Sequence, residues 1–335
     1  MLAGRTIAVV VPCYRVHDHI EAAVADLPAA VDAIILVNDA CPYGSEKAIA
    51  RIKDPRVTVI AHEVNQGVGG AVISGFDLCR QRGYDIIVKY DGDGQMSGAD
   101  LPNIVQPLLT RRADYTKGNR WVRTTDLNRM PFVRRLGNIG LSFMAKAASG
   151  YWNVFDVNNG YVAIEKTALD LIEFPNLQKR YFFENSMLIH LNIVRAVVVD
   201  VPLRSRYGTE KSSLSLTRTF VEFPLHLARG LMRRVWWRHF IFDFSLFAIY
   251  LVTGSLLCLL GLAFGSYEWY LSYKTGQPAT GGTVMLAALP VIAGLQLLLQ
   301  MVMMDIVSVP TSPLCANVSV EQRTGPPEHA STKST

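Results

Sequence analysis

Two carboxylates and a carboxamide occur within five residues, in the stretch Asp91-Gly92-Asp93-Gly94-Gln95. The stretch follows the apolar run Ile86–Val88, where a buried strand is expected to end. An EF-hand calcium loop is excluded, because Met96 and Pro102 stand where that loop needs glycine and glutamate. A plain surface turn would explain the glycines but not the paired acids. Two hard oxygen donors one residue apart suit Mg²⁺ or Mn²⁺, whose other positions are filled by water and substrate phosphates.

Short apolar segments alternate with helical segments over the first 200 residues. The expected strands are 6–11, 33–37, 57–61, 85–89 and 196–201, and the expected helices are 19–27, 46–52, 70–81 and 101–111. Strands that are apolar on both faces and separated by helices predict a doubly wound α/β domain with a parallel sheet. Ligands of such sheets bind beyond the carboxyl ends of the strands. Three polar clusters stand at such ends: Pro12–Tyr14, Asn38–Asp39 and Asp91–Gln95.

Composition narrows the class of protein. The chain has 335 residues, is 50% hydrophobic and carries a formal net charge of +5. No long basic run accompanies this charge, so we expect no nucleic-acid partner. The five cysteines include no C-x-x-C pair, which favours reduced thiols in the cytosol over a disulfide framework or a zinc site.

The last third of the chain has the composition of a membrane anchor. Residues 216–239 interleave arginines with aromatic and aliphatic residues, which is typical of a helix on a membrane surface. Two apolar runs, 240–265 and 281–305, are long enough to span a bilayer, and their connector contains Lys274 as its single basic residue. The positive-inside rule then keeps residues 1–215 cytoplasmic. We expect Asp243 and Asp305 at the cytoplasmic interface in reach of water, and a polar, disordered tail over 310–335.

Several motifs together resemble a known family. The segments VVVPCY (9–14), LVNDACP (36–42), NQGVGGAVISG (65–75) and DGDGQ (91–95) occur in the order seen in family 2 inverting glycosyltransferases, which have the nucleotide-sugar-binding GT-A fold. Five further segments are similar to the polyprenyl-phosphate branch of that family: KGNRW (117–121), MPFVRRLGN (130–138), DVNNGY (156–161), RYFFEN (180–185) and RYGTEKSSL (206–214). The resemblance covers about residues 5–215 and implies an α/β GT-A domain followed by a two-helix transmembrane hairpin.

The resemblance also implies roles for individual residues. The nucleotide sugar would be bound by Pro12, Tyr14, Asn38, Asp39, Asp91 and Lys211, the last from a mobile loop. The metal would be held by Asp91, Asp93 and Gln95, and the acceptor's phosphate by Arg120, Arg134 and Asn138. The chain departs from the branch at Val16, where a Glu is usual, and at Ser205, where an Arg is usual. These departures leave the base and the sugar open.

The expected reaction is inverting, metal-dependent transfer of a hexose from GDP-mannose or a UDP-hexose to undecaprenyl or dolichyl phosphate. It would take place at the cytoplasmic face of a bilayer, most simply a bacterial inner membrane, and a homo-oligomer is left open. The role of Glu184 depends on which acceptor the enzyme uses. A hydroxyl acceptor on a lipid-linked glycan needs Glu184 as base, whereas a phosphate acceptor is already anionic and needs Glu184 only to orient other groups. A third alternative is a membrane protein that binds the same ligands without catalysis.

Overall fold

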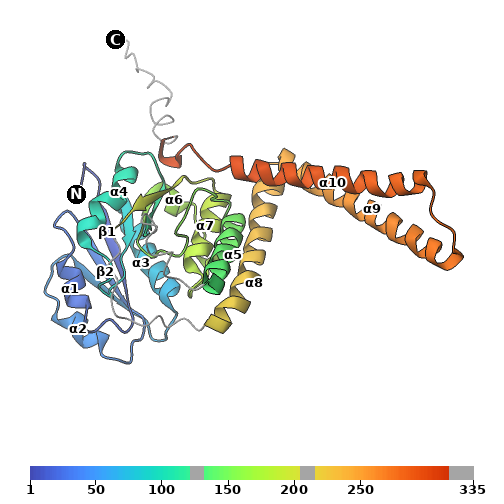
Figure 1. Ribbon diagram of the computed structural model, residues 1–335. Helices are drawn as coiled ribbons and strands as arrows, with labels where there is room; N and C mark the ends of the chain where they lie inside the picture. The colour runs from blue at the N-terminus through green and yellow to red at the C-terminus, as the bar shows by residue number, and fades with distance from the viewer. Residues whose placement is uncertain (121–131, 204–215, 317–335) are drawn as a thin grey trace, which may run out of the picture. The chain divides into compact units, whose positions relative to one another are not determined.

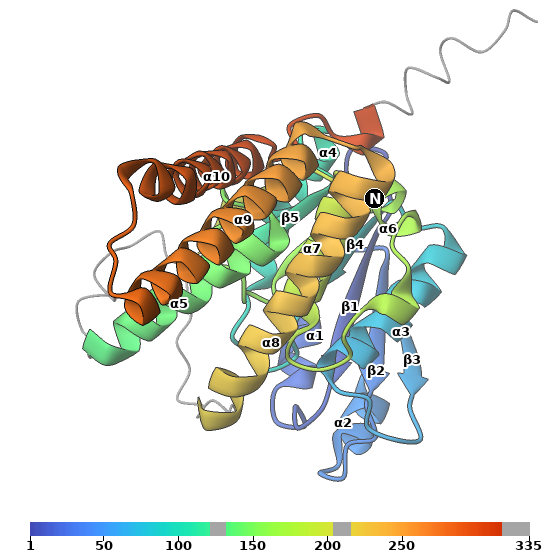
Figure 2. The ribbon, with the colours of Figure 1, turned by 90° about the vertical axis from the view of Figure 1, so that its right-hand side faces the viewer.

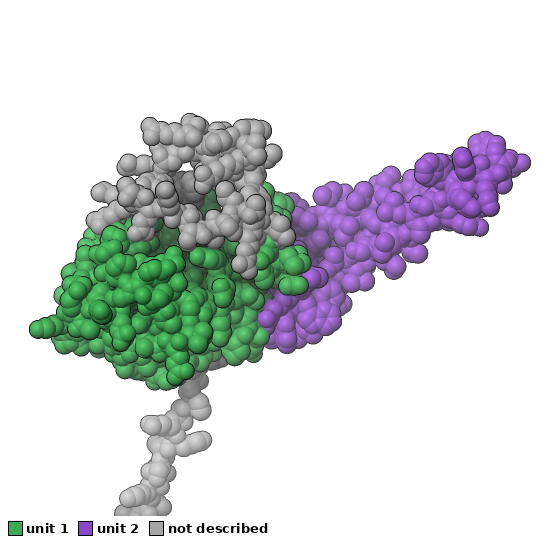
Figure 3. Space-filling view, turned by 90° about the horizontal axis from the view of Figure 1, so that it is seen from below, with its two compact units in different colours: residues 1–230, 310–335 green, residues 231–309 purple. Residues whose placement is uncertain are grey.

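The computed structural model describes residues 1–120, 132–203 and 216–316, with the backbone alone for helical residues 132–139 and 216–221. The chain forms two compact units, residues 1–230 with 310–335 and residues 231–309 (Figure 3). Figure 1 labels the helices and the strands β1 and β2, and Figure 2 also labels β3, β4 and β5.

A seven-stranded sheet in the order β3-β2-β1-β4-β6-β5-β7 forms the centre of the first unit. Its strands are β1 (Ile7–Cys13), β2 (Ala33–Asn38), β3 (Val57–Ala61), β4 (Ile86–Lys89), β5 (Tyr115–Asn119), β6 (Val162–Glu165) and β7 (Val198–Pro202). The four strands β1 to β4 are mutually parallel, as the sequence predicts. The sheet as a whole is mixed, because β6, a strand that the sequence analysis did not predict, runs antiparallel to both β4 and β5. Two successive reversals leave β5 parallel to β4, so both strands end at the same edge.

Helices cover both faces of this sheet. The helices of this unit are α1 (Ile20–Ala25), α2 (Ser45–Arg51), α3 (Val68–Arg82), α4 (Leu101–Leu109), α5 (Phe132–Ser149), α6 (Lys166–Asp170) and α7 (Phe183–Ile193), with single 3-10 turns at Gly98–Asp100 and Phe174–Asn176. A further helix, α8 (Leu216–Val235), begins in this unit and ends in the second. Successive side chains of a strand point to opposite faces. In β1, Val9 and Val11 therefore pack with α1 and α4, whereas Val10 faces Gly75 of α3. Figure 2 shows α7 in front of the strands.

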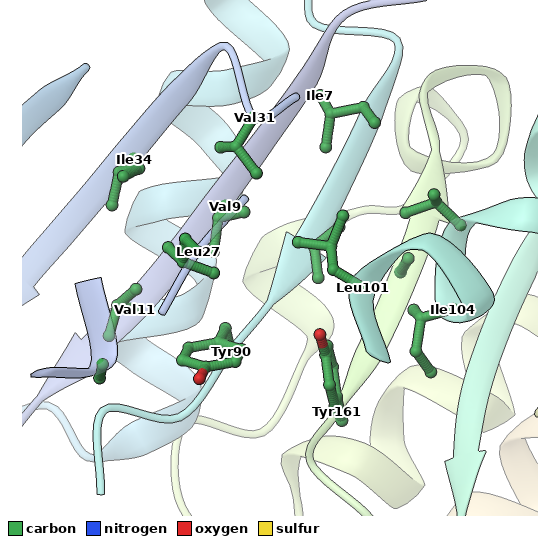
Figure 4. Packing of buried hydrophobic residues seen from close by; sticks show 14 of the residues in the cluster. Ile7, Val9, Val11, Leu27, Val31, Ile34, Tyr90, Leu101, Ile104 and Tyr161 are labelled. Atoms are coloured by element: carbon green, nitrogen blue, oxygen red, sulfur yellow. The ribbon is translucent and has the colours of Figure 1, made fainter. Parts of the chain in front are cut away.

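The core under α1 and α4 is fully closed to solvent. Ile7, Val9 and Val11 are inaccessible there and pack among aliphatic side chains of neighbouring elements (Figure 4). Tyr90 and Tyr161 close the end of this cluster with their rings edge to face, 5.5 Å between centroids. Burying apolar side chains of this size contributes about 1.5–3 kcal/mol each, so this core fixes where the strands end and where the polar turns begin.

The second unit contains two helices that qualify as candidate membrane spans by length and composition, α9 (Leu246–Thr275) and α10 (Gly281–Val307). A π-helical segment, Trp236–Phe242, precedes them, so the first long helix begins later than the apolar run at 240 suggests. Glycines let the two helices approach closely: a β-carbon at Gly261 would lie 2.7 Å from the carbonyl oxygen of Ala287. Small residues at such contacts are typical of helix pairs in membranes.

Asp305, near the end of α10, is buried rather than in reach of water. Its two carboxylate oxygens accept hydrogen bonds of 2.7 and 3.0 Å from the Arg234 guanidinium, whose side chain is 1% exposed. Each of these two buried charges is therefore paired with a charge of opposite sign. Asp243, by contrast, is exposed as expected.

Candidate active site

The polar clusters predicted at strand ends meet at one edge of the sheet. The parallel pairing of β1 with β2 sets Cys13 opposite Asn38, and the pairing of β1 with β4 sets Val10 opposite Lys89. The residues that follow these strands, including Tyr14 and Asp91, therefore leave the sheet on the same side. Arg120 joins them, because it follows β5, which is parallel to β4.

The turn after β4 holds the three predicted metal ligands. Gly94 adopts φ +75°, a conformation that glycine takes without strain, and the backbone N–H of Gln95 donates to Asp93 Oδ1 at 3.0 Å. The Asp91 side chain is 27% exposed. Within the described part of the chain, no group of three or more His, Cys, Asp or Glu could enclose an ion. Asp91, Asp93 and Gln95 supply two carboxylates and one carboxamide, which are the oxygen donors that a hard divalent cation takes together with oxygens from a diphosphate and water.

The edge beside β1 and β2 offers an aromatic surface and one amide. Tyr14 is 40% exposed, and the guanidinium of Arg15 lies over its ring and over the ring of Tyr43, 5.4 and 4.6 Å from the centroids. The side-chain oxygen Oδ1 of Asn38 accepts a 3.3 Å hydrogen bond from the backbone N–H of Cys41. Sequence reasoning did not single out Arg15. Its position directly after Tyr14, the tyrosine of the first motif, is the feature of the sequence that could have indicated a role at this edge.

Asp39 is committed to the protein itself. It is 2% exposed, and its Oδ1 lies 2.8 Å from His62 Nδ1. The backbone N–H groups of Gln66 and Gly67 each donate to its carboxylate at 2.8 Å. Asp39 thereby fixes the loop that leads into α3, and its predicted contact with the nucleotide stays a prediction.

Arg120 is held from behind by a buried carboxylate. Its Nε donates to Asp156 Oδ2 at 2.8 Å, and its Nη2 donates to Asp156 Oδ1 at 3.2 Å. Asp156 is 4% exposed, whereas the Arg120 side chain is 43% exposed. This pairing fixes the plane of the guanidinium at the edge of the site. Sequence reasoning gave no role to Asp156.

The other predicted acceptor and loop residues fall outside this description. Arg134 and Asn138 belong to the first turns of α5, where the side chains are not described. Lys211 lies in 204–215, outside the described residues.

Pro12, which was predicted to contact the nucleotide, is inside β1, opposite Val37 of β2.

Two lysines that the sequence analysis did not single out lie beneath the site. Lys89 and Lys117 are 1% and 0% exposed. Lys89 Nζ lies 2.7 Å from Asp91 Oδ1 and 3.4 Å from Glu184 Oε1. Burial, the largest influence, lowers the pKa of Lys89, but the carboxylates of Asp91 and Glu184 outweigh it and raise that pKa above its ordinary value. For Lys117, burial dominates and lowers the pKa to about 8.

Comparison with known proteins identifies the family. Residues 8–172 match Glycosyl transferase family 2. The undecaprenyl-phosphate mannosyltransferase of Micrococcus luteus is 30% identical over 173 residues, which span 51% of this chain and 70% of that protein. The chain belongs to glycosyl transferase family 2. It is therefore a glycosyltransferase, and the expectation of non-catalytic binding is set aside.

The match to another named relative covers more of the chain. The UDP-N-acetylglucosamine–dolichyl-phosphate N-acetylglucosaminyltransferase of Methanococcus voltae is 29% identical over 239 residues, which span 67% of this chain and 94% of that protein. Among solved structures, glucosyl-3-phosphoglycerate synthase from Mycobacterium tuberculosis in complex with UDP aligns with 69% of this chain and 80% of its own. Its TM-score is 0.51 at 20% identity, which shows that the two proteins share the fold. The predicted GT-A fold is thereby confirmed.

Proposed function

We propose that this glycosyltransferase transfers a hexose from a nucleotide sugar to the phosphate of a polyprenyl carrier, with inversion at the anomeric carbon. The observation that carries the proposal is the position of Arg120. Its guanidinium is exposed, fixed by Asp156 and placed at the same sheet edge as the Asp91–Gln95 turn. A planar, oriented guanidinium suits phosphate oxygens. The two named relatives act on dolichyl phosphate and undecaprenyl phosphate, which supports a carrier of this kind.

In this proposal the donor lies along the edge from β1 to β4. Tyr14 and Asn38 contact the nucleoside, and Asp91, Asp93 and Gln95 hold the divalent cation and the diphosphate. When bound, Mg²⁺ or Mn²⁺ neutralises charge on the leaving nucleoside diphosphate. A related structure of the same fold was obtained with Mn²⁺ and UDP-glucose, which supports testing Mn²⁺ first. Arg120 orients the acceptor's phosphate so that one of its oxygens attacks the anomeric carbon from the face opposite the leaving group.

The proposal is tested with the full chain in nanodiscs, with Mn²⁺, undecaprenyl phosphate and a panel of radiolabelled UDP- and GDP-sugars. We expect label to enter the organic phase from one donor, and Asp93→Ala and Arg120→Ala to abolish this transfer. The anomeric configuration of the product, determined by NMR, tests inversion. Failure to glycosylate undecaprenyl or dolichyl phosphate from any donor, while a donor still binds, would refute a phosphate acceptor and leave a hydroxyl acceptor with Glu184 as base.

We further propose that α9 and α10 span the membrane as a hairpin and keep the GT-A domain on the cytoplasmic side. The arginine-rich segment before α9 and the single basic residue of the connector, Lys274, support this orientation. Tyr273 is 86% exposed near the end of α9 and provides a labelling site. A Tyr273→Cys variant in intact cells should react with a membrane-impermeant maleimide, and protection until the cells are lysed would overturn the orientation.

A further inference from the structure

Lys89 and Lys117 project from the same face of the sheet. Lys89 at the end of β4 and Lys117 in β5 are both paired with Val162 of β6, the strand between them. Side chains that lie in register on adjacent strands point to the same face. That face is the one covered by α3, because Lys89 is also in register with Val10, which faces Gly75. Two lysine side chains are thus buried on the same face of the sheet, one on each side of β6, beneath the proposed donor site, where unpaired charge is costly.

Glu184 comes down onto these lysines from the start of α7. The helix begins at Phe183, which is fully buried and packs edge to face against Phe76 of α3, 6.5 Å between ring centroids. This contact fixes the first turn of α7 and with it Glu184, whose side chain is 12% exposed. The carboxylate lies 3.4 Å from Lys89 Nζ, and its charge also acts on Lys117.

Lys89 joins Glu184 to the metal turn. Its ammonium donates to Asp91 Oδ1 at 2.7 Å and to the carbonyl oxygen of Gly160 at 3.2 Å. Lys117 in turn donates to the carbonyl oxygen of Asn159. The carboxylate of Glu184 is therefore already occupied as a counter-ion, and Asp91 is held from below by a group that cannot turn toward solvent.

We propose that Lys89 is a positioning residue, whose buried ammonium holds Asp91 and Glu184 in one ion-pair triad, and that Glu184 serves this triad rather than accepting a proton. The proposal rests on the proposed function and deepens it, because a site in which Glu184 is a counter-ion rather than a base needs an acceptor that arrives already anionic. Lys89 itself touches neither substrate. It acts through the orientation of Asp91.

A double-mutant cycle tests the triad. Lys89→Met leaves the carboxylates of Asp91 and Glu184 without the buried cation they share, so we expect kcat to fall by about 100-fold, with a smaller change in the KM for the acceptor. Glu184→Gln removes one charge and keeps the shape of the side chain, and we expect a loss of less than about 10-fold. In Lys89→Met/Glu184→Gln the surplus charge is gone, and we expect recovery of at least 10-fold over Lys89→Met. A base would behave differently: Glu184→Gln alone would cost about 100- to 10,000-fold, and the double variant would recover nothing.

Binding of UDP and GDP with Mn²⁺ to the full chain, measured by calorimetry, keeps this test separate from the choice of acceptor. We expect Lys89→Met to weaken binding of the preferred nucleotide at least 10-fold and Glu184→Gln in the same chain to restore it, even if no polyprenyl phosphate is glycosylated. Lys146→Met is the matched control, because Lys146 donates to the carbonyl oxygen of Trp152 at 3.0 Å, away from the triad. A folded Lys89→Met variant with binding and kcat within threefold of wild type would overturn the proposal. If that variant does not fold, a loss of 100-fold or more in Glu184→Gln overturns it, and a loss under 10-fold supports it.

Discussion

Gly160 is the position where a single methyl group should disturb the active site most directly. A β-carbon built there would lie 2.5 Å from Asp91 Oδ2 and 2.5 Å from Lys89 Nζ. Ordinary contact begins at 3.4 Å, so Gly160→Ala requires displacements that sum to about 0.9 Å along each of these directions (3.4 − 2.5). Lys89 is buried on all sides and cannot retreat, whereas Asp91 is partly exposed. We therefore expect the Asp91 carboxylate to move.

The size of the effect follows from that displacement. A misplacement of about 1 Å in a catalytic arrangement can cost about 100-fold in rate, and overpacking of a buried site typically costs about 1–3 kcal/mol of stability. For a domain of about 150–250 residues each kcal/mol lowers Tm by roughly 2–4 °C. Gly160→Ala should therefore fold, melt several degrees lower and turn over about 100-fold more slowly at saturating donor and Mn²⁺.

Transfer of label from nucleotide sugar to undecaprenyl phosphate in nanodiscs measures this loss. Gly140→Ala is the matched control, because Gly140 is exposed on α5 and a β-carbon there meets no atom within 4 Å. The control should keep activity within twofold. A Gly160→Ala enzyme that is folded and retains activity within threefold would show that the close approach of Asp91 and Lys89 to this glycine is irrelevant to turnover.

Two further predictions concern buried charges. Burial lowers the pKa of Lys117 from 10.5 to about 8, so the unfolded chain binds this proton more tightly than the folded protein between these pH values. The contribution of Lys117 to stability should therefore rise with pH across that window, by up to about 1.4 kcal/mol per pH unit. The measurement is the difference in thermal stability between wild type and Lys117→Met, and a difference that does not change from pH 8 to 10 would contradict the prediction. In the second unit, Asp305→Asn leaves the buried Arg234 without its counter-charge and should destabilise the chain by about 3–5 kcal/mol, whereas the exposed Asp243→Asn should melt like wild type. Equal melting temperatures of the two variants in detergent would refute the importance of the pair.

The part of the fold that could be predicted from the sequence is the part fixed by local pattern. Strands β1 to β4 are short apolar runs between helical segments, and their carboxyl edge follows from parallel pairing. The strands β5 and β6 were not expected. Tyr115–Asn119 contains Thr, Lys, Gly and Asn, and Val162–Glu165 has four residues. Such segments become strands through pairing with each other and with β4 and β7, which is a tertiary influence that overrides local propensity.

The same limit applies to the site. The sequence motifs pointed to Asp91, Arg120 and Glu184, but they assigned no role to the groups that orient Asp91 and Arg120, although Lys89 stands two residues before Asp91 and Asp156 opens one of the quoted motifs. A lysine inside a strand that is apolar on both faces, such as Lys89, is a usable signal, because a buried ammonium requires an anionic partner. Which partner it has depends on the register of β4 with β6 and on the start of α7, neither of which is visible in the sequence.

Asp91 and Arg120 share one principle of construction. Each is partly exposed at the sheet edge, and each is bonded from behind by a group of opposite charge that is almost completely buried, Lys89 or Asp156. Because the buried member of each pair has no room to turn, the exposed member loses little conformational entropy when a ligand arrives. The negative turn and the positive guanidinium are thus set in place by the protein before either substrate binds. Asp156 holds Arg120 in place as Lys89 holds Asp91. The proposed reaction needs both charged groups in fixed positions, because its nucleophile and its leaving group are both anionic and each must be held by positive charge.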